Sequence, residues 1–288
     1  DLNGTELVLD VDGDTSITSD TDDQIDIKVA GSDKVVISST SHLSTTTAGT
    51  SNLVLGVNAG NSIQSGGNYN TALGDEAGTA ITTGDENTLV GYVSGDAITT
   101  GIRNVAVGSY ALSTNVAGDQ SVAVGHGALF TQNPSGNADM NNVAVGHDAG
   151  NQVTTGKENT FVGSLAGDAI TSSNYNTALG SGALGADDLG SFSTAIGRAA
   201  LANQNYASAT NGHNTAVGAN AGEQITTGIV NTLIGSLAGD AVTTGNNNTA
   251  VGYNALGAEI QGDASTAIGV GALQSQSNSS DTDVFNTA

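Results

Sequence analysis

The chain has 288 residues, with 28 acidic and five basic side chains, and a formal net charge of −23. Such a surface repels phosphate backbones and anionic headgroups, so we expect neither a nucleic-acid partner nor electrostatic adhesion to a membrane. The absence of Cys removes disulfides and thiolate metal sites. No apolar run of about 18 residues is present, so we expect no membrane insertion in this segment.

The composition indicates a repetitive β architecture. The chain contains 41 Gly, one Pro, no Trp and only ten Phe and Tyr together. With so few large side chains a spherical core would be hard to fill, so any core has to be thin and made of Ala, Val, Leu and Ile.

Residues 1–48 are predicted to form a small, acidic, strand-rich module. Candidate strands lie at Thr5–Leu9, Gln24–Val29 and Lys34–Ile37, where β-branched and aliphatic residues cluster. A Ser/Thr-rich segment at 38–51 joins this module to the rest of the chain.

An acidic run in this module is the one candidate metal site. Asp10, Asp12 and Asp14 offer the carboxylate oxygens that Ca²⁺ prefers. Their spacing departs from the EF-hand loop and no bidentate Glu closes the site, so a solvated hairpin turn is the simpler interpretation. Apart from this Ca²⁺ candidate, no cofactor is expected.

From residue 49 onward the chain repeats a motif of the form Asn-Thr-Ala-Val-Gly. The motif Gly falls at 56, 74, 91, 108, 125, 146, 163, 180, 197, 218, 235, 252 and 269. From Gly74 onward three 17-residue steps are followed by one 21-residue step, which together make a larger 72-residue unit. Such regularity predicts a solenoid over 49–288. Since the motif is cut short at Ala288, we expect the repeat to continue beyond it.

The local pattern predicts short strands. The residue before the motif Gly is always Val, Leu or Ile, and in most copies a second aliphatic residue comes seven positions after it. We therefore expect each coil to contain two short strands and two turns. The predicted fold is all-β: a parallel β-solenoid, or β-roll, of about thirteen 17-residue coils. Stacking at about 4.8 Å per coil gives a rod of roughly 60 Å.

The first motif position predicts a ladder of stacked side-chain amides. Each amide can bond to the next coil and to turn backbone. The ladder residues are Asn70, Asn87, Asn104, Asn142, Asn159, Asn176, Asn214, Asn231 and Asn248, with Ser at 121, 193 and 265.

Two adjacent apolar residues precede each motif Gly, as Ala178 and Leu179 do. Successive strand side chains point to opposite faces, so both faces of the strand are apolar. One face can fill the interior of the coil. We expect the other to meet another copy of the chain, most simply in a homotrimer.

Catalytic chemistry is not indicated, and we expect no enzyme. The four histidines are His42, His126, His147 and His213. His126 and His147 share the position after their motif Gly, where other copies carry Ser, Arg, Ala, Tyr or Val, so we interpret it as an exposed, variable turn position. The acidic residues are scattered over turns without a paired constellation.

Two further surfaces are candidates for binding. Thr82-Thr83 and Thr99-Thr100 lie in adjacent copies, which suggests an ice- or polysaccharide-binding array, but the next two copies interrupt it. The 21-residue steps insert loops that should protrude from the rod and carry Met140, Tyr206 and His213. We take these three residues as candidate receptor contacts, with a longer turn that binds nothing as the alternative.

Two resemblances suggest a biological setting. The motif with its following small residue, as in Ser265–Gly269 with Ala272, resembles the head repeats of trimeric autotransporter adhesins. The stretches 4–18 and 22–31 are similar to tail-fibre and other virion structural proteins of marine-type bacteriophages. The 17-residue coil is longer than the usual adhesin-head repeat, and no coiled-coil stalk or membrane anchor is visible.

These resemblances imply a non-enzymatic, trimeric fibre protein. We expect a virion tail fibre, or a comparable extracellular surface appendage, that acts as a rigid rod and contributes to attachment to a host glycan or surface protein. The alternatives are the head domain of a bacterial trimeric adhesin and an ice- or polysaccharide-binding solenoid.

Overall fold

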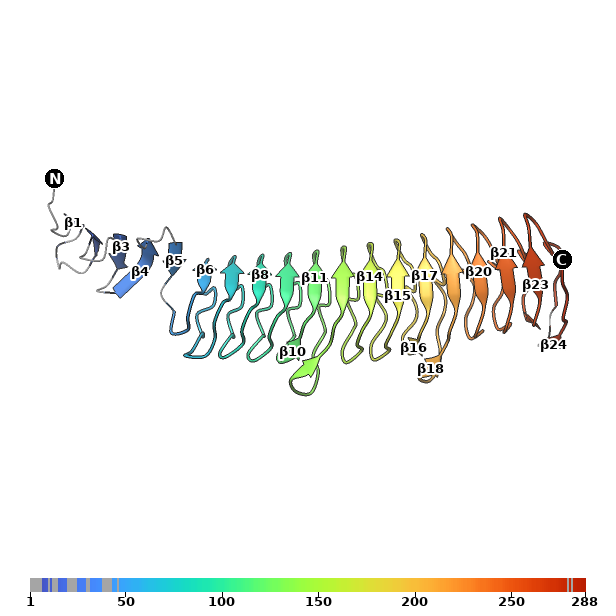
Figure 1. Cartoon of the computed structure of the whole chain (residues 1–288), viewed down its shortest axis with the longest axis horizontal. Helices are drawn as coiled ribbons and strands as arrows, with labels where there is room; N and C mark the ends of the chain where they lie inside the picture. The colour runs from blue at the N-terminus through green and yellow to red at the C-terminus, as the bar shows by residue number, and fades with distance from the viewer. Residues whose placement is uncertain are drawn as a thin grey trace.

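The computed structural model describes residues 7–9, 11, 15–19, 25–29, 32–37, 43–45, 47–278, 280 and 282–288. All regular structure in these residues is β (Figure 1). The first five strands form an antiparallel meander. They are β1 (Leu7–Val8), β2 (Ser16–Ser19), β3 (Ile25–Val29), β4 (Ser32–Ile37) and β5 (Leu43–Thr45). The sequence patterns predicted no strand at β5, which lies within the Ser/Thr-rich segment.

The rest of the chain is a parallel β-solenoid, as the repeat predicts. One three-residue strand per coil contributes to a 13-stranded parallel sheet that runs the length of the rod (Figure 1). Its strands are β6 (Leu53–Leu55), β7 (Thr71–Leu73), β8 (Thr88–Val90), β9 (Val105–Val107), β11 (Val122–Val124), β13 (Val143–Val145), β14 (Thr160–Val162), β15 (Thr177–Leu179), β17 (Thr194–Ile196), β19 (Thr215–Val217), β20 (Thr232–Ile234), β21 (Thr249–Val251) and β23 (Thr266–Ile268).

The register brings equivalent residues of successive coils side by side. Phe161, for example, pairs with Ala144 on one neighbouring strand and with Ala178 on the other. Because the pairing never slips, each position of the repeat forms a column along the rod. Every column therefore has a fixed environment, and the sequence in that column can be explained by it.

The expected second strand in every coil is wrong. Around the second aliphatic residue, where a strand was expected, the described backbone of most coils bends into the Thr-Thr-Gly turn instead. The N–H groups of Thr82, Thr83 and Gly84 all donate to the carbonyl of Thr99 in the next coil, at 3.0, 3.2 and 3.1 Å. A strand would spread these donors over several carbonyls.

Short extra strands occur where the 72-residue unit closes. They pair in parallel as β10 (Gly118–Asp119) with β12 (Ala138–Asp139), β16 (Gly190–Ser191) with β18 (Thr210–Asn211), and β22 (Gly262–Asp263) with β24 (Thr282–Asp283). The first two pairs lie beside the loops that protrude in Figure 1.

The motif glycine is required by the spacing of the coils. Gly163 has φ 135°, and a Cβ on it would lie 2.7 Å from the carbonyl carbon of Gly180 in the next coil. Both the positive φ and the close backbone approach exclude any other residue. The same contact recurs between most neighbouring motif glycines, which explains why this position never varies.

The core alternates its large residues according to the 72-residue unit. The middle strand residue points inward and is usually Ala, but becomes Leu89, Phe161 or Leu233 once per unit, and all three are fully buried. A Cβ added to Gly150 would lie 2.8 Å from the Phe161 ring, and one added to Gly167 would lie closer still. Each large ring or isobutyl group therefore fills the space that two glycines leave empty.

In the other two coils of the unit the arrangement is reversed. Leu112 and Leu129 occupy the position of those glycines, opposite Ala106 and Ala123, and all four are buried. Both leucines have positive φ, 55° and 50°. Such a conformation costs a non-Gly residue about 1–2 kcal/mol, which the burial of a leucine side chain offsets.

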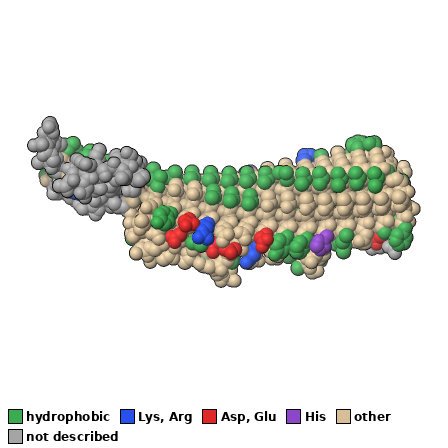
Figure 2. Space-filling view, in the orientation of Figure 1, with side chains coloured by type: hydrophobic (Ala, Val, Ile, Leu, Met, Phe, Trp, Pro, Cys, Tyr) green, Lys and Arg blue, Asp and Glu red, His purple; other side chains and the backbone are tan. Residues whose placement is uncertain are grey.

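The outward face of the sheet carries an exposed aliphatic column. It consists of the last residue of each three-residue strand: Leu55, Leu73, Val90, Val107, Val124, Val145, Val162, Leu179, Ile196, Val217, Ile234, Val251 and Ile268. All thirteen are partly or largely exposed, with Leu179 at 45% and Ile268 at 62%. Figure 2 shows this aliphatic column as a continuous green band along the rod.

Candidate functional site

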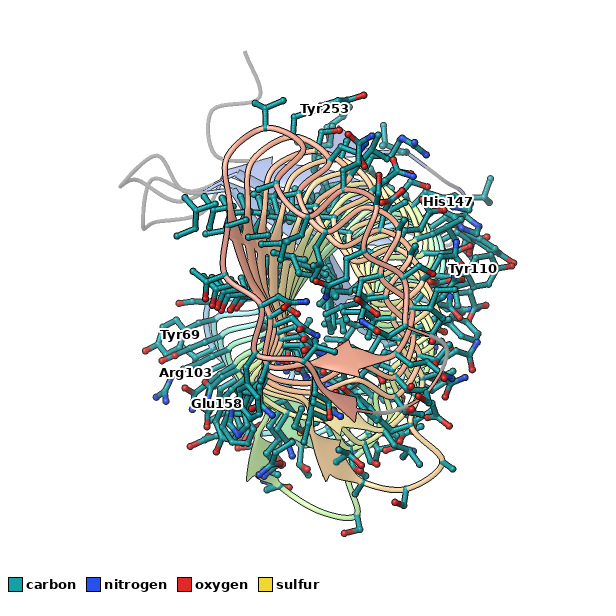
Figure 3. The ribbon with its side chains drawn as sticks, turned by 90° about the vertical axis from the view of Figure 1, so that its right-hand side faces the viewer. Tyr69, Arg103, Tyr110, His147, Glu158 and Tyr253 are labelled. Carbon is teal, nitrogen blue, oxygen red and sulfur yellow. The ribbon has the colours of Figure 1, made fainter. Side chains whose placement is uncertain are left out.

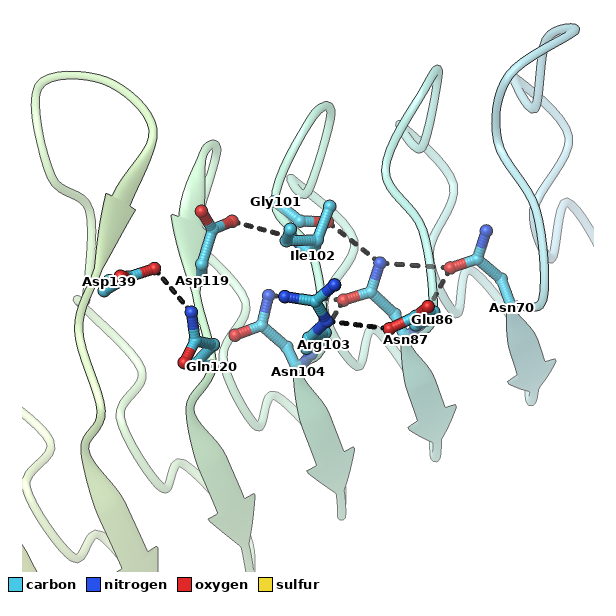
Figure 4. Close-up of polar contacts among 10 residues, drawn as sticks. All are labelled: Asn70, Glu86, Asn87, Gly101, Ile102, Arg103, Asn104, Asp119, Gln120 and Asp139. Atoms are coloured by element: carbon cyan, nitrogen blue, oxygen red, sulfur yellow. Dashed lines mark hydrogen bonds and ion pairs between the residues drawn. The ribbon is translucent and has the colours of Figure 1, made fainter.

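The asparagine ladder is built into the buried edge of the sheet. The Oδ1 atom of Asn159 accepts a hydrogen bond from the backbone N–H of Asn176 at 2.9 Å. Its Nδ2 donates to the carbonyl of Ser173 at 2.9 Å. Figure 4 shows the same contacts from Asn70 to Asn104. The nine predicted ladder residues are all buried, and each side chain satisfies backbone groups that water cannot reach.

The serine rungs of the ladder are completed by a glutamine that the sequence patterns did not reveal. Gln204, seven residues after its motif Gly, is fully buried where most coils have an aliphatic residue. It donates to Ser193 Oγ at 3.1 Å and accepts from Asn214 Nδ2 at 2.8 Å. Gln132 is placed in the same way beside Ser121 and Asn142. The ladder therefore continues through every unit.

A buried polar residue lies one coil before each of the glutamines at this position, which are Gln132, Gln204 and Gln276 in the three units. The residue is Asn115, Asp187 or Glu259 in the three successive units, and all are fully buried. Asp187 accepts from Gln204 Nε2 at 2.6 Å and from the N–H of Gly190 at 3.0 Å. Burial raises the pKa of Asp187 to about 6, although these two hydrogen bonds act against the shift.

Glu259 shows the opposite balance. Burial acts to raise its pKa, but hydrogen bonds from Gln276, Gly262 and Asn278 outweigh that effect and hold the pKa below its usual value. All of these groups serve the backbone or each other, so we interpret the buried polar set as structural.

Acidic side chains in the turns also hold neighbouring coils together. Asp119 Oδ1 accepts from the backbone N–H of Ile102 at 2.7 Å, and Asp85 Oδ1 accepts from the N–H of Asn68 at 2.5 Å. Figure 4 also shows Arg103 paired with Glu86 at 2.8 Å on the surface. These acidic side chains therefore have a structural role between coils, and their presence in the turns does not require a bound ligand.

Two of the three predicted receptor contacts are buried, which corrects that expectation. Met140 is fully buried and Tyr206 is 4% exposed. The Tyr206 hydroxyl donates to the carbonyl of Gly228 at 2.9 Å, and burial raises its pKa. The inserted residues widen the coil, and a large side chain turns inward to fill the space. The exposed part of each loop consists of small residues such as Ser135 and Ala207.

His213, the third predicted contact, is exposed and belongs to an aromatic stack. Tyr175 and Phe192 stack with ring centroids 4.8 Å apart, and Phe192 and His213 stack at 5.2 Å. Each lies one residue before its ladder position, in a left-handed backbone conformation. These three exposed rings form an aromatic strip in which each ring stacks on the next along the rod.

A second aromatic group lies on another side of the coil. Tyr110, His126, Phe130, Asp148 and Asn151, with Gly127, line an open pocket of about 320 Å³. Figure 3 places Tyr110 and His147 opposite Tyr69, Arg103 and Glu158. The sequence related His126 to His147 as one exposed, variable turn position, but the pattern did not link them to Tyr110 or Phe130. In four successive coils an aromatic or His residue stands one or two positions after the motif Gly (Tyr92, Tyr110, His126 and His147), which could have revealed the group.

His126, His147 and Asp148 come together at the rim of this pocket. The imidazoles stack at 5.3 Å with an interplanar angle of 12°. Their Nδ1 atoms lie 3.7 and 3.4 Å from the two carboxylate oxygens of Asp148. Among the described residues, this is the group of His and acidic side chains whose geometry allows a shared metal ion. The Ca²⁺ candidates Asp10, Asp12 and Asp14 lie outside the described residues.

No family model matches the chain, and no curated protein matches its sequence. Within the residues that the structure describes, no helix is long and apolar enough to cross a bilayer.

Proposed function

We propose that this chain is a non-enzymatic structural rod that assembles as a homotrimer in a virion tail fibre. The observation that carries the proposal is the aliphatic column. It runs along the whole solenoid, on a chain whose formal net charge is −23.

The column is suited to meet further copies of the same chain. Both outward positions of every strand in the 13-stranded sheet are uncharged: Thr, Val or Leu at the first position, and Val, Leu or Ile at the last. A contiguous apolar surface of this length is unusual on a monomer and marks an interaction site. Because the column has the period of the coil, a parallel copy presents the same period, and each contact repeats thirteen times.

The rest of the surface supports a spacer. The coils are tied by the asparagine ladder and by pairing that never slips, so the rod is stiff over its whole length. In this proposal receptor contact is assigned to the exposed aromatic strip of Tyr175, Phe192 and His213, because the predicted loop residues Met140 and Tyr206 are buried.

The trimer is tested by measuring the mass of the protein in solution with light scattering. We expect about 85 kDa, three times the 28.2 kDa of the chain. In the variant V107D/V124D, each chain buries two carboxylates in the contact, and we expect dissociation to the monomer. A folded wild-type monomer would overturn the proposal.

The matched control is Val116→Asp. Val116 is 38% exposed but lies in a turn outside the column. We expect this variant to keep the trimeric mass. Circular dichroism of all three proteins separates a lost contact from a lost fold, because a dissociated but folded V107D/V124D chain retains its β spectrum.

The setting is tested separately by electron microscopy of the intact particle with an antibody against the solenoid. We expect the label on a tail fibre, as the resemblance of the stretches 4–18 and 22–31 implies. A label on a bacterial surface would identify an adhesin head instead, and would leave the trimer unaffected.

A further inference from the structure

The pocket rim brings together three metal-ligating side chains from two neighbouring coils. His126 follows the motif Gly of one coil, and His147 and Asp148 follow that of the next. One ligand atom from each lies within 4.8 Å of the others. The imidazoles are more than half exposed, at 56% and 59%, and can rotate, whereas the Asp148 carboxylate is 26% exposed.

We propose that His126, His147 and Asp148 bind a zinc ion. Two imidazoles and one carboxylate form a ligand set that Zn²⁺ takes in open sites, with water in the fourth position. The 3.4 Å separation of His147 Nδ1 from Asp148 Oδ2 is about the edge of a tetrahedron with zinc bonds of roughly 2.1 Å. The Nδ1 atom of His126 lies 3.7 Å from the other carboxylate oxygen, Oδ1, so rotation of its exposed imidazole has to bring it towards the zinc-bound Oδ2.

A glycine makes room for the carboxylate between the coils. Gly127 has φ 65°, and a Cβ on it would collide with Asp148 Oδ1. Asn151 Nδ2 also donates to that oxygen at 3.2 Å and to the carbonyl of Gly127 at 3.1 Å. Asn151 therefore fixes the position of the Asp148 carboxylate. The two oxygens of this carboxylate are directed towards the two imidazoles.

The next 72-residue unit carries different chemistry at the same place. Its equivalents of His126, Gly127, His147 and Asp148 are Arg198, Ala199, Ala219 and Asn220. Arg198 donates to Asn220 Oδ1 at 2.6 Å. In the second unit the guanidinium of Arg198 thus joins two neighbouring coils. In the first unit a bound Zn²⁺ would join the corresponding coils at the surface.

The proposed site borders the aliphatic column, because His126 and His147 follow Val124 and Val145 by two residues. Tyr110 and His147 lie opposite Arg103 and Glu158, which are in the turn that leads into the sheet (Figure 3). All three proposed ligands belong to one chain, so zinc binding does not require the assembly and is tested independently of it.

The experiment is a calorimetric titration of the full chain with Zn²⁺ in excess Mg²⁺, which occupies exposed carboxylates but not imidazoles. We expect saturable binding of one ion per chain. In H126A/H147A the affinity should fall at least about tenfold. Co²⁺ in place of Zn²⁺ should give the visible absorption of a four-coordinate ion, which the double variant loses.

Two matched proteins sharpen the result. His213→Ala removes an exposed histidine that belongs to no group of three metal-ligating side chains among the described residues, and we expect no change in zinc binding. R198H/A199G/A219H/N220D/E223N copies the site into the second unit, including the equivalent of Asn151, and should raise the stoichiometry to two. If the wild type does not bind Zn²⁺, or if H126A/H147A binds it unchanged, the proposal is wrong.

Discussion

One position in the solenoid carries three different buried polar residues in three successive units. Asn115, Asp187 and Glu259 occupy equivalent places beside a glutamine. The neutral Asn115 satisfies the same turn, accepting from Gly118 N–H at 2.9 Å and donating to its carbonyl at 2.9 Å. The ionised form of Asp187 is therefore not needed for the fold.

We predict that Asp187→Asn stabilises the protein at neutral pH. The pKa of Asp187 is about 6 in the folded chain against 3.8 in the reference state, so the folded state binds a proton more tightly. Ionisation of this carboxyl lowers folded stability as pH rises from about 4 to 6, by up to roughly 3 kcal/mol above pH 6. At pH 8 the variant should unfold at a higher temperature than wild type, and the difference should shrink at pH 4.5.

The reciprocal change provides the control. Asn115→Asp places a carboxyl in the equivalent buried site, and we expect it to destabilise the protein at pH 8 more than at pH 4.5. Comparing each variant with wild type at the same pH removes the contribution of the other acidic groups. A difference that is the same at both pH values would show that the carboxyl at 187 does not titrate as described.

A single coil is specified jointly with its neighbours. Phe161 on β14 fills space left by Gly150 of the preceding coil and by Gly167 in the turn after its own strand. In two coils of the unit, glycines such as Gly150 and Gly167 leave space that Phe161 fills. In the other two coils a leucine such as Leu129 takes the glycine position and faces an alanine. No single 17-residue coil contains this pattern.

We predict that Phe161→Ala costs about 3–5 kcal/mol, because two glycines and an alanine cannot fill the cavity. Phe161→Leu should cost about 1.5 kcal/mol or less, since Leu89 and Leu233 serve in the same place in the other units. Denaturant unfolding of both variants at one protein concentration measures the difference. Equal losses would mean that the ring does not fill the space between the coils.

For the rod as a whole, the 72-residue unit is the unit of construction. Stability in such a solenoid is close to a sum over units and their interfaces. Deleting 147–218 joins Gly146 to Ala219 with every column in phase. We predict that this protein folds as a shorter rod with an unfolding temperature near that of wild type.

Deleting 147–163 is the control. It removes one 17-residue coil and keeps the motif spacing, but it removes Phe161 while leaving Gly167 opposite alanines. We expect the shorter deletion to lower the unfolding temperature more than the longer one. The opposite order, measured by calorimetry, would show that the 17-residue coil is the independent unit.

The repeat alone was enough to predict the solenoid, its parallel register and the asparagine column. A strict 17-residue period stacks identical environments, so a position restricted to Asn or Ser, or to Gly, shows its role without coordinates. The expected trimer also came from the sequence, from two adjacent apolar residues, and it stays a prediction. The second strand was predicted wrongly, because apolar spacing does not show where three N–H groups will share one carbonyl.

Contacts between residues at different positions of the repeat became visible only in the folded chain. Met140 and Tyr206 turn inward, since the added residues of each insertion create space that must be filled. Gln132 and Gln204 join the ladder, and Asp148 reaches the stacked imidazoles of His126 and His147, which belong to the neighbouring column. Contacts within a column follow from the period, whereas contacts between different columns depend on the curvature of each coil, which the spacing of residues does not encode.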